Sequence, residues 1–200
     1  MRKDDYLEEK LPKMHPWKLC FLAFLVSVAA ANSLAAQSEP ASARWNFGLE
    51  ADALPYLTGG YFAAGWAGKG LWRIRLLTAD VNKPDWFTQK GFTNHHITAY
   101  AAVADRFLKP EWAGWWIGGG LVYWKSTIQT DARIQTVRFN NILANGSLGY
   151  HLPLFSSIYL SPWAGLSLRI GGDQDVHVDQ KTYTLPFLNP EASLKVGIFF

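Results

Sequence analysis

Three groups of polar side chains in this sequence have types and spacings that could do chemistry. The first combines a histidine with carboxylate and hydroxyl side chains on neighbouring predicted strands, an arrangement in which a base activates a nucleophile. It comprises His95, Asp80 on the preceding strand, and Ser126 or Thr127 on the following one. We expect His95 to lie at the outer rim of a sheet and to point outward. An enzyme acting at that rim is therefore one hypothesis for the function.

The second group lies in the segment "GGDQDVHVDQ", where acidic and histidine side chains recur at every second residue. Asp173, Asp175, His177 and Asp179 would share one face of an extended chain. Carboxylate oxygens suit a hard divalent cation, but the spacing lacks the turn glycine of a calcium loop. A solvated hairpin is the favoured interpretation and a divalent cation site is the alternative. No other cofactor is expected.

The third group is a set of charged side chains on the polar face of the predicted strands. If that face points into a closed interior, these charges must pair, and we expect Arg169 to lie level with Glu191, with Asp52 across the closing seam. An ion-pair plug that stiffens the interior is favoured, and an anion site that uses the surplus cations is the alternative. The predicted network comprises Arg44, Glu50, Asp52, Arg73, Arg75, Arg106, Arg169, Glu191 and Lys195.

Strands are needed to position these groups, and polar and apolar residues alternate with the period of two that strands produce. The alternation is clearest in four segments, which begin at Arg44, Asn141, Ile158 and Glu191. Segments of about ten residues with one apolar and one polar face are the sequence signature of transmembrane barrels. The apolar face of the first segment comprises Trp45, Phe47, Leu49, Ala51 and Ala53.

Four further segments are predicted as strands, which brings the total to eight. They run from Tyr61 to Lys69, Leu71 to Asp80, His95 to Phe107 and Trp112 to Ile128. The last of them has aromatic residues on both faces, so its parity stays open. In the third of them we assign four residues to the outward, apolar face and Arg106 to the inward face. The four are Ile97, Ala99, Ala101 and Val103.

The predicted connections alternate between short turns and long loops, as in a barrel whose turns lie on one side of a membrane and whose loops lie on the other. Only the first connection on the loop side, 55–60, is brief. The short connections are 68–70, 108–111 and 153–157, and the long ones are 81–94, 127–138 and 171–190.

The N-terminal segment from Met1 to Ala36 is predicted to be a cleavable signal peptide. A basic lead-in precedes the apolar run from Leu19 to Ala30, which has the length of a signal-peptide core and is too short to span a bilayer as a helix. Met14 is a plausible true start, and a retained membrane anchor is the alternative. Residues 37–200 then form one domain without cysteine, which is compatible with an oxidising compartment.

The composition of the chain favours a membrane interface and gives no support for nucleic acid as a partner. The net charge is only +3, so there is no strong basic field. The chain has ten tryptophans, and only Trp17 precedes residue 37. Trp and Tyr collect where one end of the ring is apolar and the other is wet. A closed β-barrel is the spanning structure available to a chain without a long apolar helix.

A soluble, lipocalin-like ligand-binding barrel is the alternative, because periodicity alone does not tell the inside of a barrel from the outside. The polar face mixes charged residues with many Gly, Ser and Ala, as a narrow packed interior would. The surface of a soluble barrel should instead be rich in Lys and Glu. The pattern therefore favours an eight-stranded antiparallel up-and-down transmembrane β-barrel.

These features together resemble the small eight-stranded outer-membrane barrels of Gram-negative bacteria, over the whole of residues 37–200. The resemblance implies outer-membrane localisation, a monomer, and contact with membrane lipids and lipopolysaccharide. It also implies that the barrel-assembly machinery reads the last strand. The residues concerned are Leu194, Val196, Ile198 and Phe200.

The resemblance does not select one family, and it leaves the activity open. The acyl-removing enzymes of this class carry a His-x-Ser motif, whereas this chain has His96-Ile97-Thr98. An eight-stranded barrel is only wide enough for its side chains to fill it, so an open pore is not expected. A structural or adhesive role of the outer loops is the favoured hypothesis. A lipid-A-modifying acyl enzyme at the outer rim is the first alternative, and the soluble barrel is the second.

Overall fold

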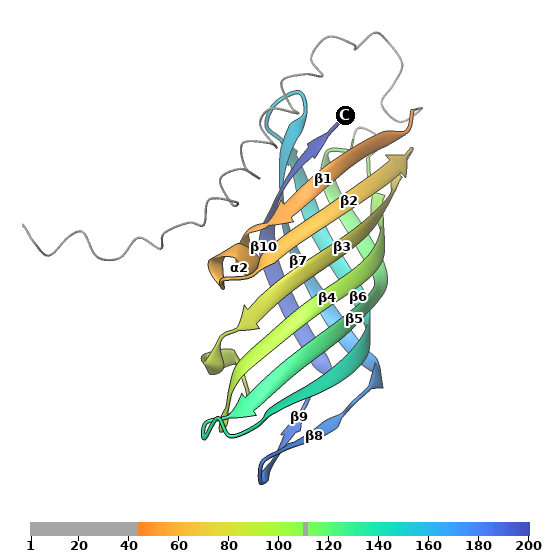
Figure 1. The fold of residues 1–200 in the computed structure, drawn as a ribbon. Helices are drawn as coiled ribbons and strands as arrows, with labels where there is room; N and C mark the ends of the chain where they lie inside the picture. Colours follow the sequence, from red (N-terminus) through yellow and green to blue (C-terminus); the bar gives the residue numbers. More distant parts are fainter. Residues whose placement is uncertain (1–43, 110–111) are drawn as a thin grey trace, which may run out of the picture. The chain divides into compact units, whose positions relative to one another are not determined.

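Eight antiparallel strands form a closed up-and-down barrel in this computed structural model, which describes residues 44–109 and 112–200 (Figure 1). Each strand pairs with its neighbours in sequence, and β1 closes the ring against β10. The barrel strands are β1 (Asn46–Asp52), β2 (Tyr61–Lys69), β3 (Trp72–Lys83), β4 (Phe92–Phe107), β5 (Gly114–Thr130), β6 (Thr136–Pro153), β7 (Ile158–Gly172) and β10 (Leu188–Phe199). The predicted all-β, eight-stranded barrel is confirmed. The predicted signal peptide lies outside the described residues.

The two ends of the barrel differ, because one carries short turns and the other carries longer connections with structure of their own. We call them the turn end and the loop end. At the loop end, helix α2 (Ala53–Leu57) follows β1, the 3₁₀ turn η1 (Asp85–Phe87) follows β3, and a hairpin of β8 (Asp175–Val178) and β9 (Lys181–Thr184) precedes β10. None of the described helices is long and apolar enough to cross a membrane.

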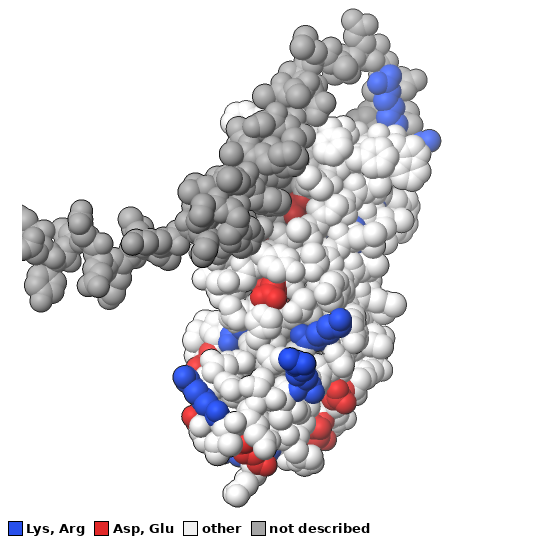
Figure 2. Space-filling model, in the orientation of Figure 1, with Lys and Arg blue, Asp and Glu red and all other residues white. Residues whose placement is uncertain are grey.

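Side chains alternate along each strand between the interior and the outer surface. The outer face of β3 carries Trp72, Ile74 and Leu76, and Ile74 is 60 % exposed. On the face shown in Figure 2, charged side chains gather toward the loop end and are few along the wall above it. The apolar faces predicted to point outward in β1, β6, β7 and β10 do so, except that Ile198 of β10 is buried. In β5, whose parity was open, Trp115 points outward and Trp116 is buried inside.

The parity predicted for β4 is wrong. Ile97, Ala99 and Val103 are buried inside the barrel, whereas Tyr100 and Arg106 on the alternate positions are exposed. A shift of one residue transfers every side chain of a strand to the other face. The error arose because the outer face of β4 is no more apolar than its inner face, so the alternation did not distinguish them.

Large aromatic side chains fill the turn end of the interior. Trp116 and Tyr159 are completely buried there and pack with other rings of the same cluster. Glycines at the paired positions of the neighbouring strands make room for them. A Cβ on Gly197 would lie 2.1 Å from Tyr159 Cζ, and one on Gly149 would lie 2.4 Å from Trp116 Cζ2. Small residues on the inner face therefore allow a narrow barrel to enclose large rings.

The hairpin β8–β9 packs onto the loop end of the barrel through apolar side chains. Val178 and Tyr183 of the hairpin are buried against Phe92 of β4, Ile128 of β5 and Phe139 of β6. The connection 171–190, in which we predicted a solvated hairpin, therefore does contain a hairpin, but its apolar side chains are buried against the loop end of the barrel and not solvated.

Candidate functional site

The turn-end half of the lumen contains a compact cluster of two arginines between two carboxylates. Arg73 Nη1 donates to Glu50 Oε1 at 2.8 Å, and Arg73 Nε donates to Asp105 Oδ2 at 2.9 Å. Arg75 Nη1 donates to Glu50 Oε2 at 3.2 Å, and Arg75 Nη2 donates to Asp105 Oδ1 at 2.8 Å. All four side chains are buried, so each charge depends on the opposite charges around it.

Aromatic groups complete the surroundings of this cluster, which we call the arginine cluster. Tyr159 donates its hydroxyl proton to Glu50 Oε1 at 2.7 Å and accepts from Trp66 Nε1 at 2.9 Å. The guanidinium of Arg75 lies 5.1 Å from the ring centroid of Trp116, within the range of a cation–π contact. The cations are thus held by carboxylates on their edges and by ring faces, which replaces the water that they lose on burial.

A second ion pair joins the two strands that close the barrel. Lys195 Nζ of β10 lies 3.7 Å from Asp52 Oδ2 at the end of β1, and both side chains are buried. Trp163 Nε1 donates to the same carboxylate oxygen at 2.7 Å, and the Trp163 ring centroid lies 3.4 Å from Lys195 Nζ. Asp52 Oδ1 also accepts from the Leu54 N–H at 3.2 Å and so caps helix α2.

The structure brings together five of the residues predicted for the lumen network: Glu50, Arg73 and Arg75 in the arginine cluster, and Asp52 and Lys195 at the seam. The sequence prediction missed Asp105 because it assigned β4 to the wrong face.

Four predicted members lie elsewhere. Arg44 is exposed ahead of β1, and Arg106 lies on the outer surface over the ring of Trp72. Glu191 accepts from Ser167 Oγ at 2.8 Å, and no ion pair joins it to Arg169 within the part of the chain that is described. The predicted pairing of Arg169 with Glu191 is therefore wrong, and a hydroxyl satisfies the carboxylate instead.

The charge balance of the arginine cluster favours a plug over an anion site. Arg73 and Arg75 each contact both Glu50 and Asp105, so two positive charges meet two negative ones. A mobile anion would have to displace a carboxylate that already accepts two or more hydrogen bonds. The geometry thus supports the ion-pair plug that we favoured from the sequence.

The residues proposed for a nucleophile–base arrangement do not meet. His95 points into the barrel, where only 1 % of it is exposed and its ring lies 5.4 Å from that of Tyr183. Ser126 is also buried inside, whereas Asp80 and Thr127 lie on the outer face. The outward orientation predicted for His95 is wrong for the same reason as the parity of β4.

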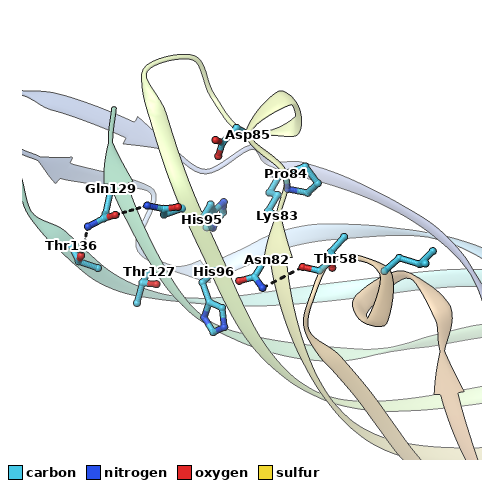
Figure 3. A pocket seen from close by; sticks show the side chains of 12 residues that line it. Thr58, Asn82, Lys83, Pro84, Asp85, His95, His96, Thr127, Gln129 and Thr136 are labelled. Atoms are coloured by element: carbon cyan, nitrogen blue, oxygen red, sulfur yellow. Dashed lines mark hydrogen bonds between the residues drawn. The ribbon is translucent and has the colours of Figure 1, made fainter. Parts of the chain in front are cut away.

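His96, not His95, faces outward, and it contacts the carboxylate of Asp80. Figure 3 shows His96 among the residues that line a pocket beside it. Its Nε2 lies 2.7 Å from Asp80 Oδ1, and the hydroxyl of Thr98 donates to Asp80 Oδ2 at 3.3 Å. Of these groups, only His96 lines an open cleft of about 700 Å³ between the ends of β3, β4 and β5. The hydroxyl is bonded to the carboxylate and not to the imidazole, so this geometry does not form a nucleophile–base pair.

The four residues proposed as cation ligands, which lie in or beside hairpin β8–β9, each have a separate partner in the hairpin or on a barrel strand. Asp173 accepts from the Asn140 N–H at 2.9 Å, Asp175 from Thr184 Oγ1 at 2.6 Å, and His177 Nδ1 lies 3.0 Å from Thr182 Oγ1. Asp179 accepts a short hydrogen bond from the hydroxyl of Thr130. Within residues 44–109 and 112–200, no three His, Cys, Asp or Glu side chains are grouped in a way that could hold a metal ion.

Comparison with known proteins does not supply a function. The sequence matches no protein-family model, and no curated protein matches it. The function therefore has to be argued from the barrel, its interior and its outer surface.

Proposed function

We propose that this chain is an integral outer-membrane β-barrel protein, exported by an N-terminal signal peptide, whose plugged lumen serves as a scaffold for surface-exposed loops. The observation that carries the proposal is the apolar outer face of the strands. Side chains that a soluble barrel would bury are exposed here on successive strands, and such a surface has to be covered. They include Ile74, Leu76, Ile117, Leu121, Leu148 and Leu166.

The height of this apolar face supports placement in a membrane. Arg106 lies over the Trp72 ring toward the turn end, and Lys125 lies over the Tyr100 ring toward the loop end. Lys125 pairs with Thr98 of β4, eight positions from Arg106. At ~3.3 Å per residue and a tilt of ~40°, that separation is roughly 20 Å along the barrel axis, close to the ~25 Å apolar band of such barrels. Cations over aromatic rings are typical of the two interfaces.

The last strand supports the proposed route of assembly. Leu194 and Val196 of β10 are exposed on the apolar face, and Phe200 is exposed beside the backbone pairing with Phe47. We propose that the barrel-assembly machinery binds this surface before β10 closes the barrel. Once inserted, the protein would contact outer-membrane lipids and lipopolysaccharide as a monomer.

A structural or adhesive role follows from the closed interior. The arginine cluster and its aromatic neighbours fill the turn end, and hairpin β8–β9 packs on the loop end, so the lumen offers no wide path for solutes. What remains available to other molecules is the loop-end surface, where charged side chains gather.

Cell fractionation and gel migration test this proposal. The protein should sediment with outer membranes, need detergent for extraction, and migrate faster on a gel when unheated than when boiled. Recovery in a detergent-free periplasmic extract, with no change of migration on heating, would contradict the membrane proposal and favour the soluble barrel.

A further inference from the structure

The loop-end half of the lumen contains an apolar cavity that the arginine cluster does not fill. Its volume is about 330 Å³, within the range of small-molecule sites. Its wall is formed by aliphatic side chains from β3, β4 and β5, and three alanines on β3 and β4 leave the space open. The residues that define this wall are Leu77, Ala79, Ala99, Ala101, Val103 and Val122.

The barrel wall beside this cavity is incomplete. β1 pairs with β10 only as far as Asp52 opposite Lys195, whereas β10 continues to Leu188 and pairs there with β7 alone. Where β1 would continue, the chain turns into α2. Within the described residues, one hydrogen bond joins α2 to β10, from the Leu54 N–H to Ser193 Oγ at 3.1 Å.

The cavity reaches the outer surface through this gap. Residues that line it include Leu54 of α2 and three residues of β10 whose side chains are exposed outside, Leu188, Pro190 and Ala192. Pro190 has no N–H to donate to a further strand, which suits the unpaired edge. The surface around the gap is apolar, since Leu166 of β7 and Leu194 of β10 are both exposed there.

Most of the charged side chains that line the cavity have partners within the barrel. Lys195 and Asp52 pair with each other, Arg75 is held by the arginine cluster, and Glu191 accepts from Ser167 Oγ at 2.8 Å. Lys83, the last residue of β3, lines the cavity at its loop end. An occupant would therefore place an apolar chain inside and leave its polar end at the gap.

We propose that this cavity binds one saturated hydrocarbon chain, which enters sideways between α2 and β10 from the surrounding membrane. The inference rests on the proposed function, because the gap opens at the level that we place in lipid. Aliphatic walls, a lateral opening and floor residues that are already paired or hydrogen-bonded fit an alkyl chain better than a polar ligand. The chain could belong to a membrane lipid or to a free fatty acid.

Photolabelling of the full-length protein in phosphatidylcholine vesicles tests the inference. One arm uses a fatty acid with a terminal diazirine, and the other uses phosphatidylcholine that carries the same chain. Labelled residues are mapped along β4 from His95 to Phe107, where odd-numbered residues face the lumen and even-numbered ones face outward. Inward Ala101→Phe fills the cavity with a phenyl ring, and outward Ala102→Phe is the matched control.

The expected result is labelling of Ile97 and Ala99 in at least one arm, reduced at least tenfold by Ala101→Phe and unchanged by Ala102→Phe. Both variants should keep heat-modifiable migration, which shows that they fold.

Label confined to outward residues such as Tyr100, or inward label that Ala101→Phe leaves unchanged, overturns the cavity site while membrane embedding stands. Inward label from the fatty acid with no outward label supports the site and overturns the membrane proposal. Label from the phospholipid arm alone assigns the chain to a membrane lipid.

Discussion

Removal of one carboxylate from the arginine cluster should destabilise the barrel far more than loss of the charge next to it in sequence. Asp105 and Arg106 are adjacent in β4, yet Asp105 is completely buried inside and Arg106 is exposed outside. The pair Asp105→Asn and Arg106→Gln therefore changes one unit of charge at each of two neighbouring positions, in two different environments.

The magnitude follows from the contacts that Asp105 makes. It accepts from Arg73 Nε at 2.9 Å and from Arg75 Nη2 at 2.8 Å. Hydrogen bonds to charged groups contribute about 1.5–3 kcal/mol each, and removal of one partner from a buried ion pair costs about 3–5 kcal/mol. We expect Asp105→Asn to lower the free energy of unfolding by about 3–5 kcal/mol. Arg106→Gln should lower it by about 1 kcal/mol or less.

Equilibrium unfolding in guanidinium chloride, with the protein refolded into lipid vesicles, measures both effects. The two variants should share the slope of the wild type and differ in midpoint. A second test replaces the whole cluster by apolar residues of similar volume, which should recover much of the stability because no buried charge is left alone. Equal shifts for Asp105→Asn and Arg106→Gln would refute the reasoning, since they would show that the Asp105 charge is not held in a buried cluster.

A further prediction concerns packing. Gly197→Ala should lower the free energy of unfolding by about 1–3 kcal/mol, because the added Cβ would lie 2.1 Å from Tyr159 Cζ. The control is Gly65→Ala on the outer face, where a Cβ has room, and it should change the free energy of unfolding little. Equal effects of the two variants in guanidinium unfolding would contradict the packing of Tyr159.

The sequence allowed the strands to be predicted well, because alternation with a period of two is imposed by the pleat. β2 was predicted with both bounds as found, and the inward charges Glu50, Arg73 and Arg75 follow from that alternation. The connections were predicted too long, since β3 and β6 extend beyond the apolar face. The hairpin in the last connection was predicted, but its packing against the barrel was not.

The faces of β4 were not predictable from alternation, because half of the lumen is itself apolar. Ala99 and Ala101 face a cavity and not lipid, so apolar residues alone did not identify the outer face. One reversal explains three errors: Asp105 was missed, Arg106 was placed inside, and His95 was placed outside. The position of Asp105 opposite Arg73 on the paired strand was the available signal, since a buried arginine needs a carboxylate nearby.

The central claim, that the outer face of the barrel contacts hydrocarbon, is tested most directly by spin labels on that face. With Cys20 replaced by serine the chain has no other cysteine, so single labels can be placed at outward Leu76, Leu121 and Leu148, with Asp131 in the loop between β5 and β6 as the aqueous control. In vesicles, relaxation by oxygen should exceed relaxation by a water-soluble nickel chelate at the three outward sites and fall below it at Asp131. Relaxation dominated by the nickel chelate at Leu121 and Leu148, as at Asp131, would contradict the membrane barrel.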